Sequence, residues 1–181
     1  MIAASNSKRR GFTLIELMIA LAIFALLIML AGPMYSDFIG NSQIRNAGEA
    51  VLNGVRLSQS EALKHNLPTI FTLDPSTGFS ITIDDPENPG TPIFQQGYLF
   101  SDGAAKAVVT ITPPNANLIT FDGLGRIKSN DDGSQQIRAV DITHGSLPNP
   151  HQLRVVVANT TAGIGTVLCD PATSQPPTAC P

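Results

Sequence analysis

The chain has 181 residues, room for one globular domain with an appendage. Charged residues make up only 14%, and the formal net charge is −3. Three of the eleven basic residues, Lys8, Arg9 and Arg10, stand together near the N-terminus, so the remaining chain is more acidic than the whole. This balance does not suggest a broadly basic, nucleic-acid-binding surface.

An apolar run follows this basic cluster, from Phe12 to Ala31, in which only Thr13 and Glu16 are not apolar. A helix of that length spans about 30 Å, the thickness of the hydrocarbon core of a bilayer. The basic cluster is expected to stay in the cytoplasm, so that the C-terminal side crosses outward. The simplest interpretation is a plain signal anchor.

Glu16 argues against a plain anchor. An unpaired charge in a membrane helix costs on the order of 2–3 kcal/mol, and less near the interface. A cut between Gly11 and Phe12 would create a positive amino group four residues before Glu16, on the same helix face. A neighbouring copy of the chain could offer its amine instead. We therefore expect this carboxylate to have a cationic partner that processing creates.

The segment RRGFTLIELMIA resembles the class III leader of type IV pilins and type II secretion pseudopilins. The resemblance implies that residues 1–11 are a leader, which a prepilin peptidase removes after Gly11 before methylating Phe12. It also implies that residues 12–33 form a transmembrane helix that later enters the filament core. The family's assembly glutamate falls on Glu16 and its helix-breaking proline on Pro33.

Residues 34–66 are predicted to continue as an amphipathic helix, kinked rather than ended by Pro33. Leu52 and Leu63 are expected to widen its apolar stripe, and the glycines at 40, 48 and 54 to weaken it locally by about 1 kcal/mol each. The sequence Asn66-Leu67-Pro68 predicts the end of the helix. The residues of the stripe itself recur at helical spacing: Ile44, Ala47, Val51, Val55 and Ala62.

Residues 67–181 are predicted to form a β-rich domain, because alternating runs separated by turn clusters replace the helical period. The expected fold class is α+β, with the long N-terminal helix packed against an antiparallel β-sheet. The first two runs, around Asp-Pro-Ser-Thr-Gly in TIFTLDPSTGFSITID, predict a hairpin. Further strands are expected at 93–100, 107–112, 118–121, 136–143, 153–158 and 166–169. The expected core residues are Phe71, Phe79, Phe94, Phe121, Val155 and Val157.

The two cysteines, Cys169 and Cys180, stand near the C-terminus with ten residues between them. An even count, together with a membrane-targeted N-terminus, favours a disulfide in an oxidising compartment. Such a short loop would contribute roughly 2–3 kcal/mol in the chain-entropy model. Two free thiols are the alternative, whereas a metal site is disfavoured because no histidine or further cysteine accompanies the pair.

Three internal segments narrow the resemblance to the GspH/FimT family: VRLSQSEALKHNLPTIFTL, with Ser58–Ala62 in place of the family's ARSEA; ITFDGLGRI; and LRVVVANTTAGIGTVLCDP. The resemblance implies a structural minor pilin that supports assembly or initiation of a type IV pilus. The alternatives are a GspH-type minor pseudopilin of the type II secretion system and a DNA-binding minor pilin of natural transformation.

The implied location is the bacterial inner membrane, crossed once, with the C-terminal domain in the periplasm and later in a pilus or pseudopilus. The implied partners are the prepilin peptidase, other pilins or pseudopilins, the inner-membrane assembly platform and the lipid bilayer.

DNA is not expected as a partner. DNA-receptor members of the family carry Gly-Arg-x-Arg near the final hairpin, where this chain has Gly163-Ile164-Gly165-Thr166, and no lysine or arginine follows Arg154. Phosphate contacts require such cations. A small patch of Arg126, Lys128 and Arg138 remains, which is better interpreted as a solvated face.

No enzymatic activity, cofactor or metal is expected either. The histidines at 65, 144 and 151 show no ligand spacing, and no serine lies in a nucleophile-elbow pattern. Asp84-Asp85 and the sequence from Asn130 to Gly133 could supply oxygen ligands to calcium. The twelve-residue calcium loop is absent, so polar turns are the preferred interpretation.

Overall fold

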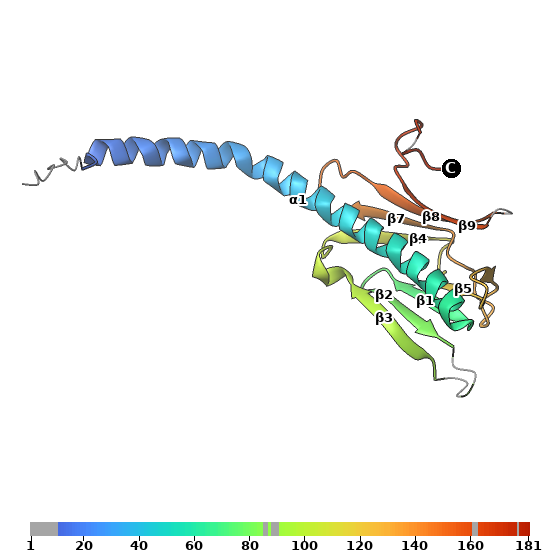
Figure 1. The fold of residues 1–181 in the computed structure, drawn as a ribbon. Helices are drawn as coiled ribbons and strands as arrows, with labels where there is room; N and C mark the ends of the chain where they lie inside the picture. Colours follow the sequence, from blue (N-terminus) through green and yellow to red (C-terminus); the bar gives the residue numbers. More distant parts are fainter. Residues whose placement is uncertain (1–10, 85–86, 88–90, 161–162, 177) are drawn as a thin grey trace, which may run out of the picture. The chain divides into compact units, whose positions relative to one another are not determined.

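The computed structural model describes residues 11–84, 87, 91–160, 163–176 and 178–181 (Figure 1). A single long helix, α1 (Leu14–His65), precedes a run of strands within this part of the chain. Contacts divide the chain into two compact units, one ending at Asp37 and the other formed by Phe38–Pro181, and α1 belongs to both. The predicted α+β class, a long helix packed against antiparallel sheet, is confirmed.

Helix α1 is continuous through Pro33, which confirms that a helical pattern resumes after this proline. It ends as predicted before Asn66, whose φ of 53° lies in the left-handed region that often follows the last helical residue. Lys64 and His65 in the last turn suit the negative end of the helix dipole.

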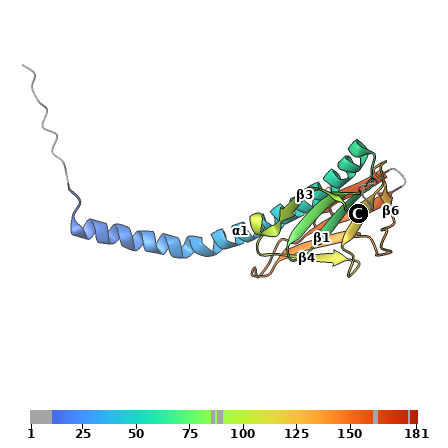
Figure 2. The same cartoon turned by 90° about the horizontal axis from the view of Figure 1, so that it is seen from below.

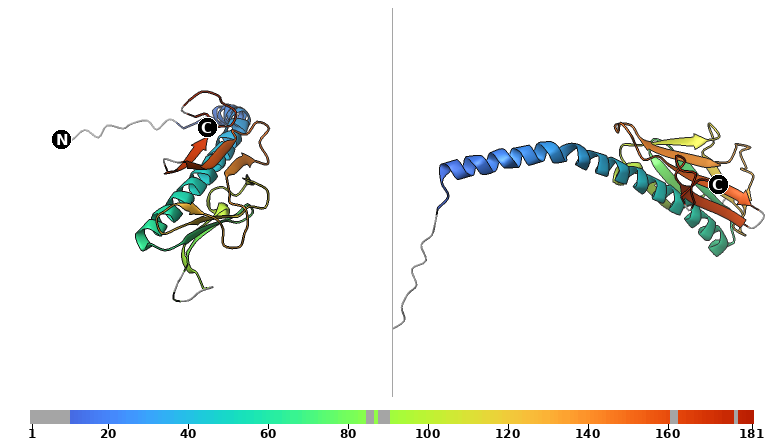
Figure 3. Two further views of the ribbon diagram at one scale, coloured as in Figure 1. Left: turned by 90° about the vertical axis from the view of Figure 1, so that its right-hand side faces the viewer. Right: turned by 90° about the horizontal axis from the view of Figure 1, so that it is seen from above.

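The strands form two antiparallel sheets, and Figures 2 and 3 show both on the same side of the domain half of α1. The first has the order β3-β2-β1-β5-β6 and the second β4-β7-β8-β9. The strand bounds are β1 Thr69–Asp74, β2 Gly78–Ile83, β3 Ile93–Leu99, β4 Ala107–Thr112, β5 Leu118–Phe121, β6 Ile127–Lys128, β7 Ala139–His144, β8 Leu153–Thr160 and β9 Gly163–Cys169.

The core lies between α1 and the two sheets. The predicted helix stripe is confirmed, since each of its five residues is at most 1% exposed. Leu52 packs against this core, but Leu63 is 54% exposed and does not widen the stripe as expected. The sheets contribute the alternate residues of their strands, which include Phe71, Leu73, Ile81, Ile119, Phe121, Val140, Ile142, Val155 and Val157.

Two helix glycines have a packing role that the sequence analysis missed. A Cβ on Gly54 would lie 2.7 Å from ring atoms of Phe79 and 2.8 Å from Phe71, and one on Gly48 would lie 3.0 Å from Leu168. The missing side chains therefore let the first sheet approach the helix backbone at Gly54 and the second sheet at Gly48. Because glycine has a low helix propensity, both residues also destabilise the helix itself relative to alanine.

Phe94 corrects the predicted core. Its side chain is 64% exposed, because β3 is an edge strand and nearly all of its residues face solvent. Alternation of side chains indicates which residues share a face of a strand, but it does not indicate whether another layer covers that face. The other five predicted core residues are buried.

Several strand bounds also differ from the prediction. The short strand β6 was missed, β7 begins at Ala139 rather than Gln136, and Phe100 belongs to a 3-10 turn, η1 (Phe100–Asp102), instead of β3. The last hairpin is longer than predicted: β8 extends to Thr160 and β9 begins at Gly163. Two glycines and few bulky residues weaken the strand pattern at the start of β9.

Candidate processing and assembly site

Gly11, Phe12 and Thr13 precede α1 and are not helical. All three are exposed, Phe12 to 83%. The predicted cleavage bond between Gly11 and Phe12 therefore lies outside the helix. Lys8, Arg9 and Arg10, which complete the predicted leader, lie outside the described residues.

Thr13 is the N-cap of α1. Its side-chain oxygen accepts a hydrogen bond from the backbone N–H of Glu16 (3.3 Å), and its carbonyl accepts one from the N–H of Leu17 (3.2 Å). These are the two bonds that define an N-cap residue. This role was not predicted from the sequence, although Thr-x-x-Glu ahead of an apolar run is a recognised start signal for a helix.

Glu16 lies in the first turn of α1, where a carboxylate interacts favourably with the positive end of the helix dipole. Its side chain is exposed, and it takes part in none of the ion pairs found in the part of the chain that the structure describes. An assembly partner supplied by another molecule is therefore compatible with this geometry.

The first half of α1 presents an apolar surface on every side. By length and composition it could cross a membrane, and none of the apolar window is buried inside the chain. Its exposed large side chains are Leu14, Ile15, Leu17, Met18, Ile19, Leu21, Ile23, Phe24, Leu26, Leu27, Ile28, Met29, Leu30 and Met34. A helix that is apolar all round requires an apolar environment, either lipid or other helices.

The second half of α1 is fixed to both sheets by polar side chains. Arg56 donates to the carbonyl of Thr166 in β9 (3.0 Å), and Gln59 donates to the carbonyl of Gly125 in the β5–β6 turn (3.0 Å). Within the family-like segment Ser58–Ala62, Ser58 and Ala62 are fully buried. This segment is thus part of the scaffold of the domain.

Two of the three cations weighed for DNA contact are bound to neighbouring carboxylates. Arg126 pairs with Asp122 at 2.8 Å and Lys128 with Asp131 at 2.9 Å. Arg138 is exposed. Since a paired cation must give up its carboxylate to bind a phosphate, the patch is a weaker anion site than the sequence alone indicates.

The turn weighed for calcium is organised by its own hydrogen bonds. Asn130 is 5% exposed; its side chain accepts from Thr120 and donates to the Ser134 side chain (both 3.0 Å). The Asp132 carboxylate accepts hydrogen bonds from the Ser134 side chain and from the Ser134 N–H, the latter at 2.8 Å, and these two bonds lower the pKa of Asp132. Asp84 is described, whereas Asp85 lies outside the described residues.

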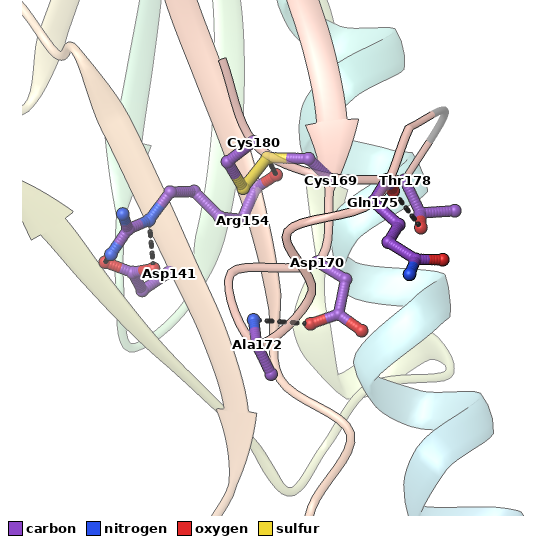
Figure 4. The surroundings of a disulfide bond; sticks show 8 residues. All are labelled: Asp141, Arg154, Cys169, Asp170, Ala172, Gln175, Thr178 and Cys180. Atoms are coloured by element: carbon purple, nitrogen blue, oxygen red, sulfur yellow. Dashed lines mark hydrogen bonds and ion pairs between the residues drawn. A yellow bond between two sulfur atoms is a disulfide. The ribbon is translucent and has the colours of Figure 1, made fainter.

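Cys169 and Cys180 are joined by a disulfide that ties the C-terminal segment to the end of β9 (Figure 4). The N–H of Asp170 bonds the carbonyl of Thr178 at 2.7 Å, so the returning chain lies beside the strand end. On the neighbouring β8, Arg154 makes a two-pronged bond to Asp141 of β7, at 2.6 and 3.0 Å, which raises the pKa of Arg154.

Comparison with known proteins identifies matches at both ends of the chain. The prokaryotic N-terminal methylation motif matches residues 6–32, and the family described as type II transport protein GspH matches residues 47–161. The type IV major fimbrial protein FimA of Dichelobacter nodosus is 40% identical over 73 residues, which are 40% of this chain and 45% of that protein. A fimbrial protein of the same organism is 38% identical over the same length. The matched region thus spans less than half the length of these curated relatives.

Two solved structures share the fold. The minor pseudopilin EpsH from the type 2 secretion system of Vibrio cholerae aligns with a TM-score of 0.53 and 10% identity, over 72% of this chain and 99% of that chain. The type IV minor pilin FimU of Pseudomonas aeruginosa PAO1 aligns with a TM-score of 0.50 and 15% identity, over 72% and 92%. The GspH match covers more than half of the chain and confirms the predicted membership. The chain is therefore a pilin-like protein that belongs to the family of the type II transport protein GspH.

Proposed function

We propose that this chain is a minor pilin, a structural subunit that supports assembly or initiation of a type IV pilus filament. One observation carries the proposal: a methylation motif leads into an apolar, unburied half-helix, whose second half is the core element of a GspH-type domain. A helix exposed in this way suits storage in lipid followed by packing among like helices.

In the proposed pathway a prepilin peptidase cuts between Gly11 and Phe12 and methylates Phe12. Residues 12–33 then anchor the protein in the inner membrane, with residues 34–66 and 67–181 in the periplasm. The assembly platform transfers the subunit to a filament of other pilins. Because lipid tails are as apolar as neighbouring helices, the hydrophobic effect alone gives this transfer little direction.

In our proposal, an ion pair of Glu16 favours the filament over the lipid. Its carboxylate sits one turn into α1, exposed and outside the ion pairs of the described chain, where the methylated amine of another subunit can reach it. Replacing Glu16 by Ala is expected to spare membrane insertion and to impair entry into filaments, whereas Asp at this position should restore part of the entry. Normal incorporation of the Ala variant would contradict the pairing.

The processing step is tested by mass spectrometry of the mature N-terminus. We expect a chain that begins with methylated Phe12, and a Gly11 substitution that leaves the precursor uncut. A native protein that retains residues 1–11 would overturn the proposed function.

A second candidate is a minor pseudopilin of a type II secretion system, which the family description and the fold shared with EpsH favour. The fimbrial relatives favour the pilus. A deletion strain scored for both surface pili and exoprotein release separates the two. Loss of pili with normal secretion supports the pilus, and a secretion defect with normal pili supports the pseudopilus.

A further inference from the structure

We propose that Thr13 is the positioning residue that keeps the Gly11–Phe12 bond out of α1 and so presents it to the peptidase in non-helical form. This inference rests on the proposed function, because it concerns the same processing site. It adds a residue whose side chain acts on the conformation of the bond that is cut, from two positions away.

The hydrogen bonds of the first turn carry the argument. If α1 began one residue earlier, the N–H of Glu16 would bond the carbonyl of Phe12, in the i to i−4 pattern of an α-helix. The side chain of Thr13 takes that N–H instead, at 3.3 Å. The first helical bond is consequently the one from Leu17 to the carbonyl of Thr13, at 3.2 Å.

A residue must fix where α1 begins, because the cleavage bond lies directly ahead of the helix. The first four N–H groups of any α-helix lack an acceptor within the helix, so a side-chain acceptor can decide at which residue the helix starts. Phe12 itself does not oppose helix formation strongly, although Gly11 before it is a poor helix former. Thr13 supplies this acceptor to the N–H of Glu16 and so favours a helix that starts after Thr13 over one that includes Phe12.

The conformation matters for the hydrolysis itself. Water adds to the Gly11 carbonyl carbon, the C–N bond to Phe12 breaks, and the products are a Gly11 carboxylate and a protonated Phe12 amine. If α1 began two residues earlier, that carbonyl would bond the N–H of Ile15 and the peptide would be enclosed within the coil. Exposed, irregular segments are the preferred sites of proteolysis, and Gly11 and Phe12 form such a segment.

Three variants of the full-length precursor test the proposal in membranes with prepilin peptidase. Thr13→Val keeps the shape and loses the acceptor, whereas Thr13→Ser and Thr13→Asn keep a capping acceptor. We expect Thr13→Val to slow cleavage about fivefold, the factor for a cap of ~1 kcal/mol at 1.4 kcal/mol per tenfold. Thr13→Ser and Thr13→Asn should be cut at about the wild-type rate.

Two kinetic outcomes would overturn the proposal. Wild-type cleavage of Thr13→Val would show that the cap is dispensable. Slow cleavage of both Thr13→Val and Thr13→Asn, with Thr13→Ser normal, would show that the peptidase reads the hydroxyl itself and not the helix start.

A second measurement needs no peptidase. Backbone chemical shifts of the precursor in micelles should report Phe12 as non-helical in the wild type and in Thr13→Asn, and as helical in Thr13→Val. An unaltered Phe12 in Thr13→Val contradicts the inference. A wild-type precursor that is never cut contradicts the proposed function instead, so the two failures are distinguishable.

Discussion

The side-chain amide of Gln59 donates a hydrogen bond to the carbonyl of Gly125 at 3.0 Å, across 66 positions of sequence. Gln59 lies near the end of α1, and Gly125 lies in the β5–β6 turn with φ +71°. The side chain of Leu63 packs where a Cβ on Gly125 would lie, 2.9 Å away. Two of the three segments that carry the family resemblance thus meet at one contact, which fixes the turn to the helix.

The same turn should make stability depend on pH. Asp122 accepts bonds from the N–H of Arg126 (2.9 Å) and of Leu124 (3.0 Å), and the Arg126 bond is the main cause of its lowered carboxyl pKa. A carboxylate with a depressed pKa stabilises the fold above about pH 4, and this contribution disappears as the pH falls through its folded pKa.

Asp122→Asn should therefore lower the thermal midpoint at pH 7 and weaken the fall of this midpoint as the pH drops below about 4. Thermal unfolding at a series of pH values measures both effects. Asp131→Asn is the matched control, because it removes an exposed carboxylate that bonds the Lys128 side chain at 2.9 Å and leaves the hydrogen bonds of Asp122 in place. Identical curves for Asp122→Asn and the wild type would contradict the role given to the turn.

Gly54→Ala should destabilise the domain although alanine is the better helix former. The new Cβ would lie 2.7–2.8 Å from ring atoms of Phe79 and Phe71, in a packed core. Overpacking costs about 1–3 kcal/mol, which outweighs the gain in helix propensity of about 1 kcal/mol. Near-UV circular dichroism of the detergent-solubilised chain follows the unfolding. Gly32→Ala in the same helix is the control, since nothing lies within 4 Å of that Cβ; a Gly54→Ala variant as stable as this control would refute the packing role.

The disulfide should stabilise the domain by restricting the conformations of the denatured chain. The Cys169→Ser/Cys180→Ser double variant opens the loop that ties the C-terminal segment to β9, and we expect it to lower the free energy of unfolding by roughly 2–3 kcal/mol. Denaturant unfolding with and without a reductant measures the effect. The reductant should lower the midpoint of the wild type and leave the double variant unchanged; a wild-type midpoint insensitive to complete reduction would argue against the contribution.

Phe94 and Phe71 offer a direct test of the corrected core. Phe71 is fully buried, so Phe71→Ala should cost about 3–5 kcal/mol of unfolding free energy. Phe94 is 64% exposed on the edge strand β3, so Phe94→Ala should change stability by no more than about 0.5 kcal/mol. Urea unfolding of both variants provides the comparison, and equal losses would mean that another layer covers β3 in solution.

The sequence by itself predicted the elements whose signals are local. Helix periodicity located the stripe from Ile44 to Ala62, Asn66 marked the end of α1, and alternation around a turn located the β1–β2 hairpin. The leader motif and the internal blocks predicted the family. Each of these depends on residues that are neighbours in the chain, so a short window contains the whole signal.

Only the tertiary structure decided the features that join distant segments. It divided the strands into two sheets, left β3 and Phe94 at an edge, and brought Phe79 against Gly54. Alternation fixes the two faces of a strand, yet the neighbours of that strand depend on which other strands pair with it. Gly54 shows the same dependence on distant residues. Its low helix propensity can be read from the sequence, but its effect on stability also depends on the aromatic ring that packs against it, which no local pattern specifies.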